Sequence, residues 1–158
     1  MVGGNTFGGG IGVVSACDMA FSVSSAKFTL SEVKLGVIPA TISPYVVARM
    51  GANNCRRYFL TAEMFDAAEA LRVGLLSGVV EDHEALDQME VHLKKHFGRA
   101  APGAVTLSKA LIFEVANRPV DLDTRKWTAT QLAHVRESDE GQEGMSAFIE
   151  KRKAAWNL

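Results

Sequence analysis

The sequence contains no long apolar run and no excess of charge of one sign. Its 17 Lys and Arg residues are balanced by 18 Asp and Glu residues, which leaves a formal net charge of −1. A nucleic-acid partner is not expected, because such a surface needs clustered positive charge and the basic residues are scattered. No apolar stretch has the length of a membrane span, so no membrane contact is expected. A signal peptide is not expected either, because the first residues form neither a charged nor an apolar region.

Cysteine is nearly absent. Cys17 and Cys55 are the two cysteines, and their separation does not fit a pair of metal ligands, so we expect free thiols in a reducing compartment. His92 and His96 have the i, i+4 spacing that can bind a metal on a helix. No third ligand accompanies them and lysines lie between them, which indicates a solvated helix face. The sequence therefore predicts no metal site.

Residues 1–81 and 82–158 differ in their patterns. The first part combines short apolar or alternating stretches with glycine-rich turns, which predicts brief strands and short helices. The second part has apolar residues at helical spacing and predicts longer helices over 84–99, 103–116, 122–136 and 139–155. With 158 residues, 47% of them apolar, the chain can fill a hydrophobic core. We expect an α/β core in 1–81 followed by a helical region in 82–158.

Local signals set the elements of the first part. Alternating residues predict a strand over 27–30, and a stop at Gly36 predicts a single helical turn over 31–36. Ser43-Pro44 is typical of a helix start, and Gly51 is expected to end that helix. A further helix over 53–60 and a strand over 78–81 complete the pattern.

A glycine triplet, Gly8-Gly9-Gly10, precedes a short run with helical spacing. Consecutive glycines leave backbone N–H groups uncovered, and at a helix start these groups and the helix dipole favour negative charge. The triplet therefore predicts a pocket for an anion or a developing oxyanion. Tight packing of a turn is the commoner reason for such glycines, and the triplet alone does not decide between the two.

Glu32 is the candidate acid/base residue. It lies between the predicted strand and Gly36, in a segment that ends at Pro39. A carboxylate is able to accept and donate a proton at a substrate carbon. From the local sequence alone, a solvated turn carboxylate is the more common interpretation.

Several ordered motifs resemble the enoyl-CoA hydratase/isomerase (crotonase) superfamily. They are Gly4-Asn5-Thr6-Phe7-Gly8-Gly9-Gly10, Cys17-Asp18, Glu32-Val33-Lys34-Leu35-Gly36-Val37-Ile38-Pro39, Asp66-Ala67-Ala68-Glu69-Ala70, Gly74-Leu75 and the segment 143–153. The resemblance implies an α/β fold of the crotonase (ClpP-like) spiral type that lacks its N-terminal part and ends in a helical region. Residues 40–44 are similar to methylglutaconyl-CoA hydratases and related branched-chain hydratases.

The resemblance also implies a function. An acyl-CoA substrate would place its thioester oxygen at the Gly9 N–H, while Glu32 moves the proton at the α-carbon. No tightly bound cofactor is implied, since coenzyme A enters with the substrate. Lys151 matches a position that meets the CoA nucleotide, and Leu132 matches an apolar position near the adenine. The charged run around Lys151 equally fits a solvated helix end.

Members of the family assemble as trimers or dimers of trimers, so a homo-oligomer is expected. The family also implies a location in a bacterial cytoplasm or, in a eukaryote, the mitochondrial matrix.

Two departures from the family pattern keep alternatives open. Gly12 stands where two-glutamate hydratases carry their second glutamate, so either Glu32 serves both steps of hydration or another group holds the water. The family's isomerases use a single glutamate, which makes an enoyl-CoA isomerase the first alternative. The N-terminal half of the family fold, with its other oxyanion donor, has no counterpart, which favours a second alternative: a non-catalytic assembly module or fragment.

Overall fold

The computed structural model describes residues 1–157, which form two compact units. The first unit is Met1–Val91 and the second begins at His92. The boundary lies inside helix α4 (His83–Phe97), whereas the boundary expected from the sequence follows the last strand of the first unit. None of the helices within residues 1–157 combines the length and apolar character that crossing a membrane requires.

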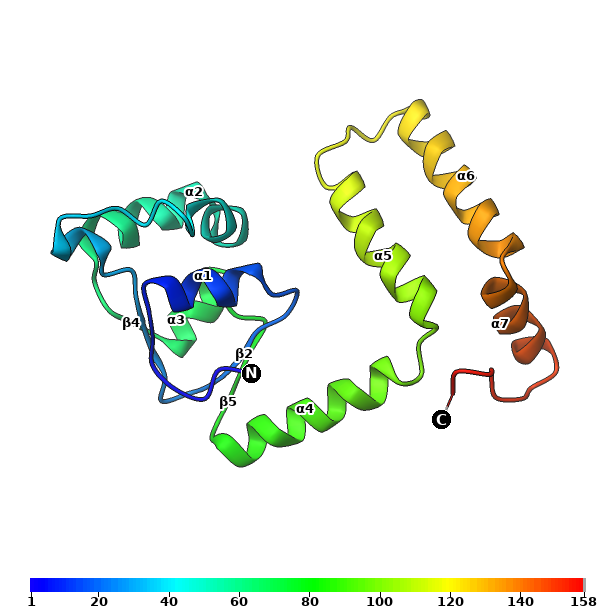
Figure 1. The fold of residues 1–158 in the computed structure, drawn as a ribbon, viewed down its shortest axis with the longest axis horizontal. Helices are drawn as coiled ribbons and strands as arrows, with labels where there is room; N and C mark the ends of the chain where they lie inside the picture. Colours follow the sequence, from blue (N-terminus) through cyan, green and yellow to red (C-terminus); the bar gives the residue numbers. More distant parts are fainter. Residues whose placement is uncertain (158) are drawn as a thin grey trace. The chain divides into compact units, whose positions relative to one another are not determined.

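The first unit alternates short strands and helices (Figure 1). Its elements are β1 (Thr6–Phe7), α1 (Gly9–Ala16), β2 (Phe21–Val23), β3 (Lys27–Thr29), the 3-10 helix η1 (Glu32–Leu35), α2 (Ser43–Thr61), β4 (Phe65–Asp66), α3 (Ala67–Arg72) and β5 (Gly78–Val80). The predicted strands at 27–30 and 78–81 and the helical turn at 31–36 are thereby confirmed to within a residue or two.

Helix α2 joins two helices that the sequence predicts as separate. Gly51 lies inside it with φ 77° and ψ 149°, which is not helical, so the chain bends there. The prediction that Gly51 interrupts the helix is confirmed, but the chain resumes a helix at once. The buried thiol of Cys55 lies in the second part, and burial raises its pKa. Cys17, at the end of α1, is free and exposed.

The strands of the first unit form two small sheets. The order is β1-β3-β4 in one sheet, with β1 parallel to β3 and β3 antiparallel to β4. The other sheet pairs β2 with β5 in parallel. Because β1 and β3 are adjacent and parallel, their carboxyl ends meet at the same edge of the sheet.

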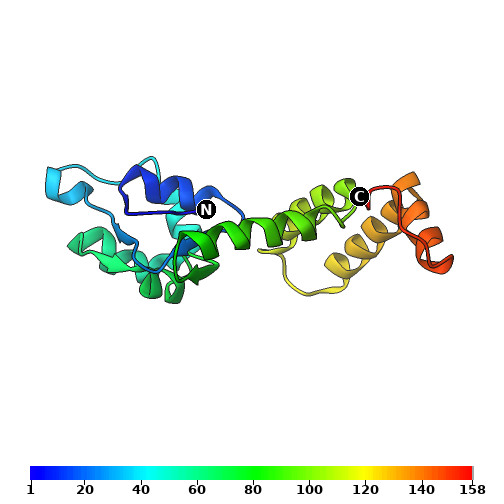
Figure 2. The same ribbon diagram turned by 90° about the horizontal axis from the view of Figure 1, so that it is seen from below.

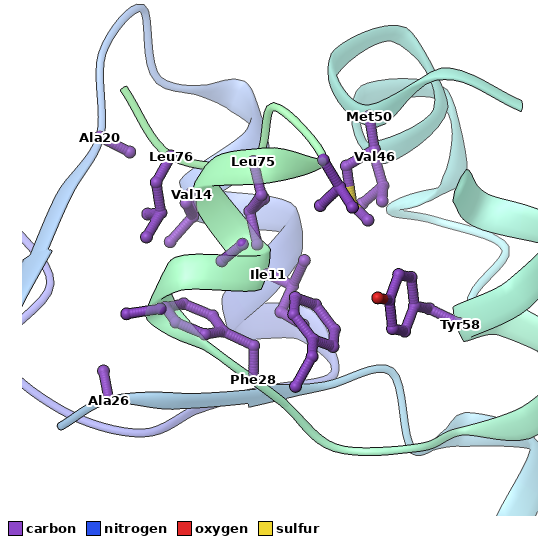
Figure 3. Packing of buried hydrophobic residues seen from close by; sticks show 14 of the residues in the cluster. Ile11, Val14, Ala20, Ala26, Phe28, Val46, Met50, Tyr58, Leu75 and Leu76 are labelled. Atoms are coloured by element: carbon purple, nitrogen blue, oxygen red, sulfur yellow. The ribbon is translucent and has the colours of Figure 1, made fainter. Parts of the chain in front are cut away.

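A hydrophobic core joins α1, α2 and α3 to the strands. Ile11 and Phe28 have no exposed surface, and Tyr58 is almost fully buried. Figure 3 shows Ile11, Phe28 and Tyr58 within this cluster. The Tyr58 ring lies 4.3 Å from that of Phe65, measured between centroids. This core fixes α1 by its inner face, so that its first residues remain at the surface.

The second unit consists of the end of α4 and three further helices, α5 (Pro102–Val115), α6 (Leu122–Glu137) and α7 (Asp139–Ile149). Figure 2 shows the chain changing direction between α6 and α7, where Ser138 has an extended backbone. Glu140 accepts hydrogen bonds from the Gly103 and Ala104 N–H groups, at 3.0 and 2.8 Å, and so caps the start of α5. Few apolar side chains of this unit are buried, and Phe148 is 84% exposed.

The last helix is shorter than the sequence predicts. A helix over 139–155 is expected from the pattern, but α7 ends at Ile149. Lys151 has a positive φ of 54°, and the Arg152 N–H turns back to the Ala147 carbonyl at 3.0 Å. The Arg152 guanidinium also donates to both carboxylate oxygens of Glu143, at 2.6 and 2.8 Å. These bonds stop the helix, which local periodicity does not reveal.

Candidate functional site

The two sequence-predicted residues of the first unit follow adjacent parallel strands. β1 ends at Phe7 and leads into Gly8 and Gly9, while β3 ends at Thr29 and leads to Glu32. The Gly8 N–H donates to the Thr29 carbonyl at 3.0 Å and extends the pairing beyond the strands. The carboxyl edge of parallel strands is where open α/β sheets commonly bind ligands. The sheet therefore brings the glycine turn and Glu32 together.

Gly8 provides the room for the Glu32 carboxylate. It has φ 47° and ψ −119°, a backbone conformation that other residues rarely adopt. A Cβ added at Gly8 would lie 3.3 Å from Glu32 Oε1. The carboxylate thus lies against the glycine turn, beside the residue that begins α1.

The start of α1 offers two uncovered N–H groups. The Ile11 N–H already donates to the Gly8 carbonyl at 2.9 Å. Within residues 1–157, the N–H groups of Gly9 and Gly10 have no hydrogen-bond acceptor. A Cβ at Gly9 would meet no atom within 4 Å, so the space in front of this residue is open. Free N–H groups at a helix start attract a negatively charged oxygen.

Glu32 differs from a freely solvated turn residue. Its side chain is only partly exposed, and Oε2 is buried without a hydrogen-bond partner among residues 1–157. Its backbone carbonyl accepts from the Val37 N–H at 3.2 Å, and Gly36 closes η1 in the left-handed conformation. The backbone of η1 is therefore fixed, and one buried carboxylate oxygen is left without a hydrogen-bond donor.

Ile42 is the neighbour that sequence reasoning missed. It is the N-cap residue of α2 and packs on Gly12 so closely that an added Cβ would lie 2.2 Å from Ile42 Cγ2. No side chain fits at Gly12 unless Ile42 moves. No local signal points to this contact, because 30 positions of chain separate the two residues.

The other two predicted residues belong to the second unit. Leu132 lies on α6 and is exposed, and it lines a largely apolar cavity of about 270 Å³ that also involves Leu107 and Trp127. Lys151 follows α7 and is exposed. The bonds of Arg152 to Glu143 and Glu150 hold the turn on which Lys151 lies.

Two further groups of titratable side chains lie outside this site. The His92 and His96 rings are 4.4 Å apart between centroids, but no group of three or more potential metal ligands occurs in residues 1–157. Glu69 accepts hydrogen bonds from Tyr58 and from Arg72 Nε, the latter at 2.5 Å. The Arg72 guanidinium and then the Tyr58 hydroxyl lower the pKa of Glu69 to about 2.

Known proteins resemble the chain in sequence and in fold. The family model described as enoyl-CoA hydratase/isomerase matches residues 1–158. A crystal structure from Legionella pneumophila, assigned to the enoyl-CoA hydratase/isomerases (crotonases), superposes with a TM-score of 0.93 at 44% identity. An enoyl-CoA hydratase from Shewanella pealeana gives a TM-score of 0.87 at 40% identity. An enoyl-CoA hydratase of Alternaria alternata is 37% identical over 142 residues.

Each relative is longer than this chain. The Legionella match covers 98% of this chain and 59% of that one, and the Shewanella match covers 97% and 57%. The Alternaria match covers 89% of this chain and 48% of the relative. The chain therefore spans about half to three fifths of these relatives, and the fold is the corresponding part of the crotonase fold. By family model, sequence identity and structure together, the chain belongs to the enoyl-CoA hydratase/isomerase (crotonase) superfamily.

Proposed function

We propose that this protein acts on acyl-CoA thioesters as an enzyme of the enoyl-CoA hydratase type. The observation that carries the proposal is the position of the Glu32 carboxylate against Gly8, beside the uncovered Gly9 N–H. One group accepts and donates a proton, and the other receives negative charge on the thioester oxygen. These are the two needs of a reaction that passes through an enolate.

In the proposed hydration, Glu32 serves both proton transfers. The carboxylate takes a proton from water as the water oxygen bonds to the β-carbon of the enoyl group. The electron pair of the double bond moves towards the thioester, and the Gly9 N–H stabilises the charge that develops on its oxygen. Glu32 then returns the proton to the α-carbon, which completes the addition of one water molecule.

A second candidate, an enoyl-CoA isomerase, is favoured by the contact between Gly12 and Ile42. This contact leaves no room at position 12 for another carboxylate beside the site. An isomerase needs only one: Glu32 would remove a proton from the α-carbon of a 3-enoyl-CoA and return it to the γ-carbon, with the same enolate between the steps. The same two residues therefore support either reaction.

The test compares the unsubstituted chain with Glu32→Gln on crotonyl-CoA, on a 3-enoyl-CoA and on butyryl-CoA in heavy water. Exchange of the α-proton of butyryl-CoA reports the enolate step alone. We expect Glu32→Gln to lower all rates by at least about 100-fold while acyl-CoA binding persists. Glu81→Gln, an exposed residue at the end of β5, is the matched control. Unchanged turnover in Glu32→Gln would contradict the proposal.

The products identify the reaction. Loss of the conjugated enoyl thioester from crotonyl-CoA supports the hydratase, and its formation from the 3-enoyl-CoA supports the isomerase. Residues 40–44 are similar to methylglutaconyl-CoA hydratases, and a preference for that substrate stays a prediction. Turnover of 3-methylglutaconyl-CoA as a further substrate tests it. We also propose Lys151 and Leu132 as contacts of the CoA nucleotide. Replacing Lys151 by Ala should then weaken binding of acyl-CoA and not of the matching acyl-pantetheine.

The assembly proposed with this function is a trimer or a dimer of trimers of this chain. The exposed apolar side chains of the second unit, such as Phe148 and Ile149, support it, because large exposed apolar surfaces usually mark interfaces. Native mass spectrometry gives the number of copies. An ordered assembly that lacks turnover and α-proton exchange would favour the non-catalytic assembly module instead.

A further inference from the structure

Two glycines at the start of α1, the N-cap Gly8 and the helical Gly12, mark the positions of two side chains from other elements. A Cβ at Gly8 would meet Glu32 Oε1, and a Cβ at Gly12 would meet Ile42 Cγ2. Gly8 is the N-cap of α1, and Gly12 lies about one helical turn further along the chain. The Glu32 carboxylate and the Ile42 side chain therefore both pack on the N-terminal part of α1.

The position of Ile42 is well fixed. Its carbonyl accepts from the Tyr45 and Val46 N–H groups, both at 3.1 Å, in the first turn of α2. Its side chain is partly buried and packs against the core of the first unit. The 3-10 helix that carries Glu32 lies against α2. Ile42 thus forms a fixed apolar surface on Gly12, about one turn along α1 from the glycine against which Glu32 lies.

We propose that Ile42 is a specificity-determining residue that contacts the acyl chain at its β-carbon and limits the size of a substituent there. The inference rests on the proposed function, because it places the thioester oxygen at the Gly9 N–H and the α-carbon at Glu32. The β-carbon is one bond further on, and the side chain that covers α1 one turn beyond Gly8 is Ile42. A branch at the β-carbon would meet the Ile42 side chain.

The experiment measures binding and so does not depend on turnover. Dissociation constants for butyryl-CoA and 3-methylbutyryl-CoA are determined by calorimetry for the unsubstituted chain, Ile42→Val and Ile42→Ala. We expect Ile42→Ala to shift the ratio of the two constants in favour of the branched ligand by about tenfold. Ile42→Val removes one methylene group and keeps most of the packing, so a shift of about fourfold in the same direction is expected.

The control is Val79→Ala, which truncates another partly buried side chain that packs on the same core from β5. It should leave the ratio unchanged, which separates a change at the site from general loosening. If Ile42→Ala does not fold, Ile42→Val carries the test. Ligand binding with an unchanged ratio in the Ile42 variants would overturn the role of Ile42 alone. Failure of the unsubstituted chain to bind either acyl-CoA would overturn the proposed function as well.

Discussion

Arg49 of α2 donates through Nη1 to the Cys17 carbonyl, at 2.6 Å, and so holds the carboxyl end of the helix whose first residue is Gly9. Its Nε donates to the Leu75 carbonyl at 2.7 Å and its Nη2 to Ser77 Oγ at 3.3 Å. One guanidinium thus ties α1 and α2 to the segment before β5. A cation at the end of α1 also complements the helix dipole.

Replacing Arg49 by Ala should lower the free energy of unfolding by about 2–3 kcal/mol, because two carbonyl groups lose a charged donor. Arg49→Lys should recover only part of this loss, since an ammonium group cannot reach three acceptors in the planar arrangement of a guanidinium. Urea denaturation followed by circular dichroism gives both values. Equal stability of Arg49→Ala and the unsubstituted chain would show that these bonds contribute little.

Gly9 allows the backbone donor itself to be removed. Proline is well tolerated at the first residue of a helix and lacks the N–H group, so Gly9→Pro should lower turnover or α-proton exchange by about 100-fold or more. Gly9→Ala is the matched control, because a Cβ there meets no atom within 4 Å and the N–H remains. Rates are compared at equal folded fraction. Similar rates in the two variants would remove Gly9 from the proposed mechanism.

The contact between Gly12 and Ile42 predicts strong coupling between the two positions. Gly12→Ala should destabilise the protein by about 1–3 kcal/mol, because its methyl group overlaps Ile42. In the double variant with Ile42→Ala, the methyl group finds space, so the total loss should be smaller than the sum of the single losses. A thermodynamic double-mutant cycle by urea denaturation measures the difference. Additive losses would mean that Ile42 moves aside at little cost.

Glu69 predicts a loss of stability in acid. Its pKa falls from 4.5 to about 2 in the folded protein, first through Arg72 and then through Tyr58. The folded state therefore binds this proton less readily than the unfolded chain, and the contribution to stability is present above about pH 4.5 and lost as the pH falls towards 2. The hydrogen bonds with Arg152 likewise lower the pKa of Glu143, so its contribution to stability is also lost in acid.

Urea midpoints measured from neutral pH down to about pH 3 test this contribution of Glu69 to stability. Glu69→Gln should flatten the fall in stability over that range, while Glu81→Gln, an exposed carboxylate, should leave the slope as it is. A slope that is the same in Glu69→Gln and the unsubstituted chain would contradict the assignment.

Sequence reasoning located β3, η1 and β5 because their signals are local. The turn at Gly36 and the break at Gly51 each depend on a glycine with positive φ. The glycines themselves can be read from the sequence, and they are the residues that adopt this conformation most easily. The family motifs also predict that Gly9 and Glu32 belong to one site. Their proximity in the structure follows from the parallel pairing of β1 with β3.

The features that sequence reasoning missed depend on contacts between distant parts of the chain. The position of Ile42 on Gly12 joins the start of α2 to the middle of α1. The early end of α7 depends on the bonds between Glu143 and Arg152, nine positions apart. Neither has a periodic signature, because each is set by packing or by a side chain that turns back on its own helix.

The N–H groups of Gly8 and Ile11 donate to the Thr29 and Gly8 carbonyls, so their hydrogens should exchange with solvent more slowly than those of Gly9 and Gly10. Solvent exchange at Gly8 and Ile11 requires a bond to open, whereas the Gly9 and Gly10 amides face water directly. One hydrogen-exchange experiment therefore reports two events. Slower exchange at Gly9 alone indicates a ligand at its N–H, and faster exchange at Gly8 indicates that β1 and β3 have separated.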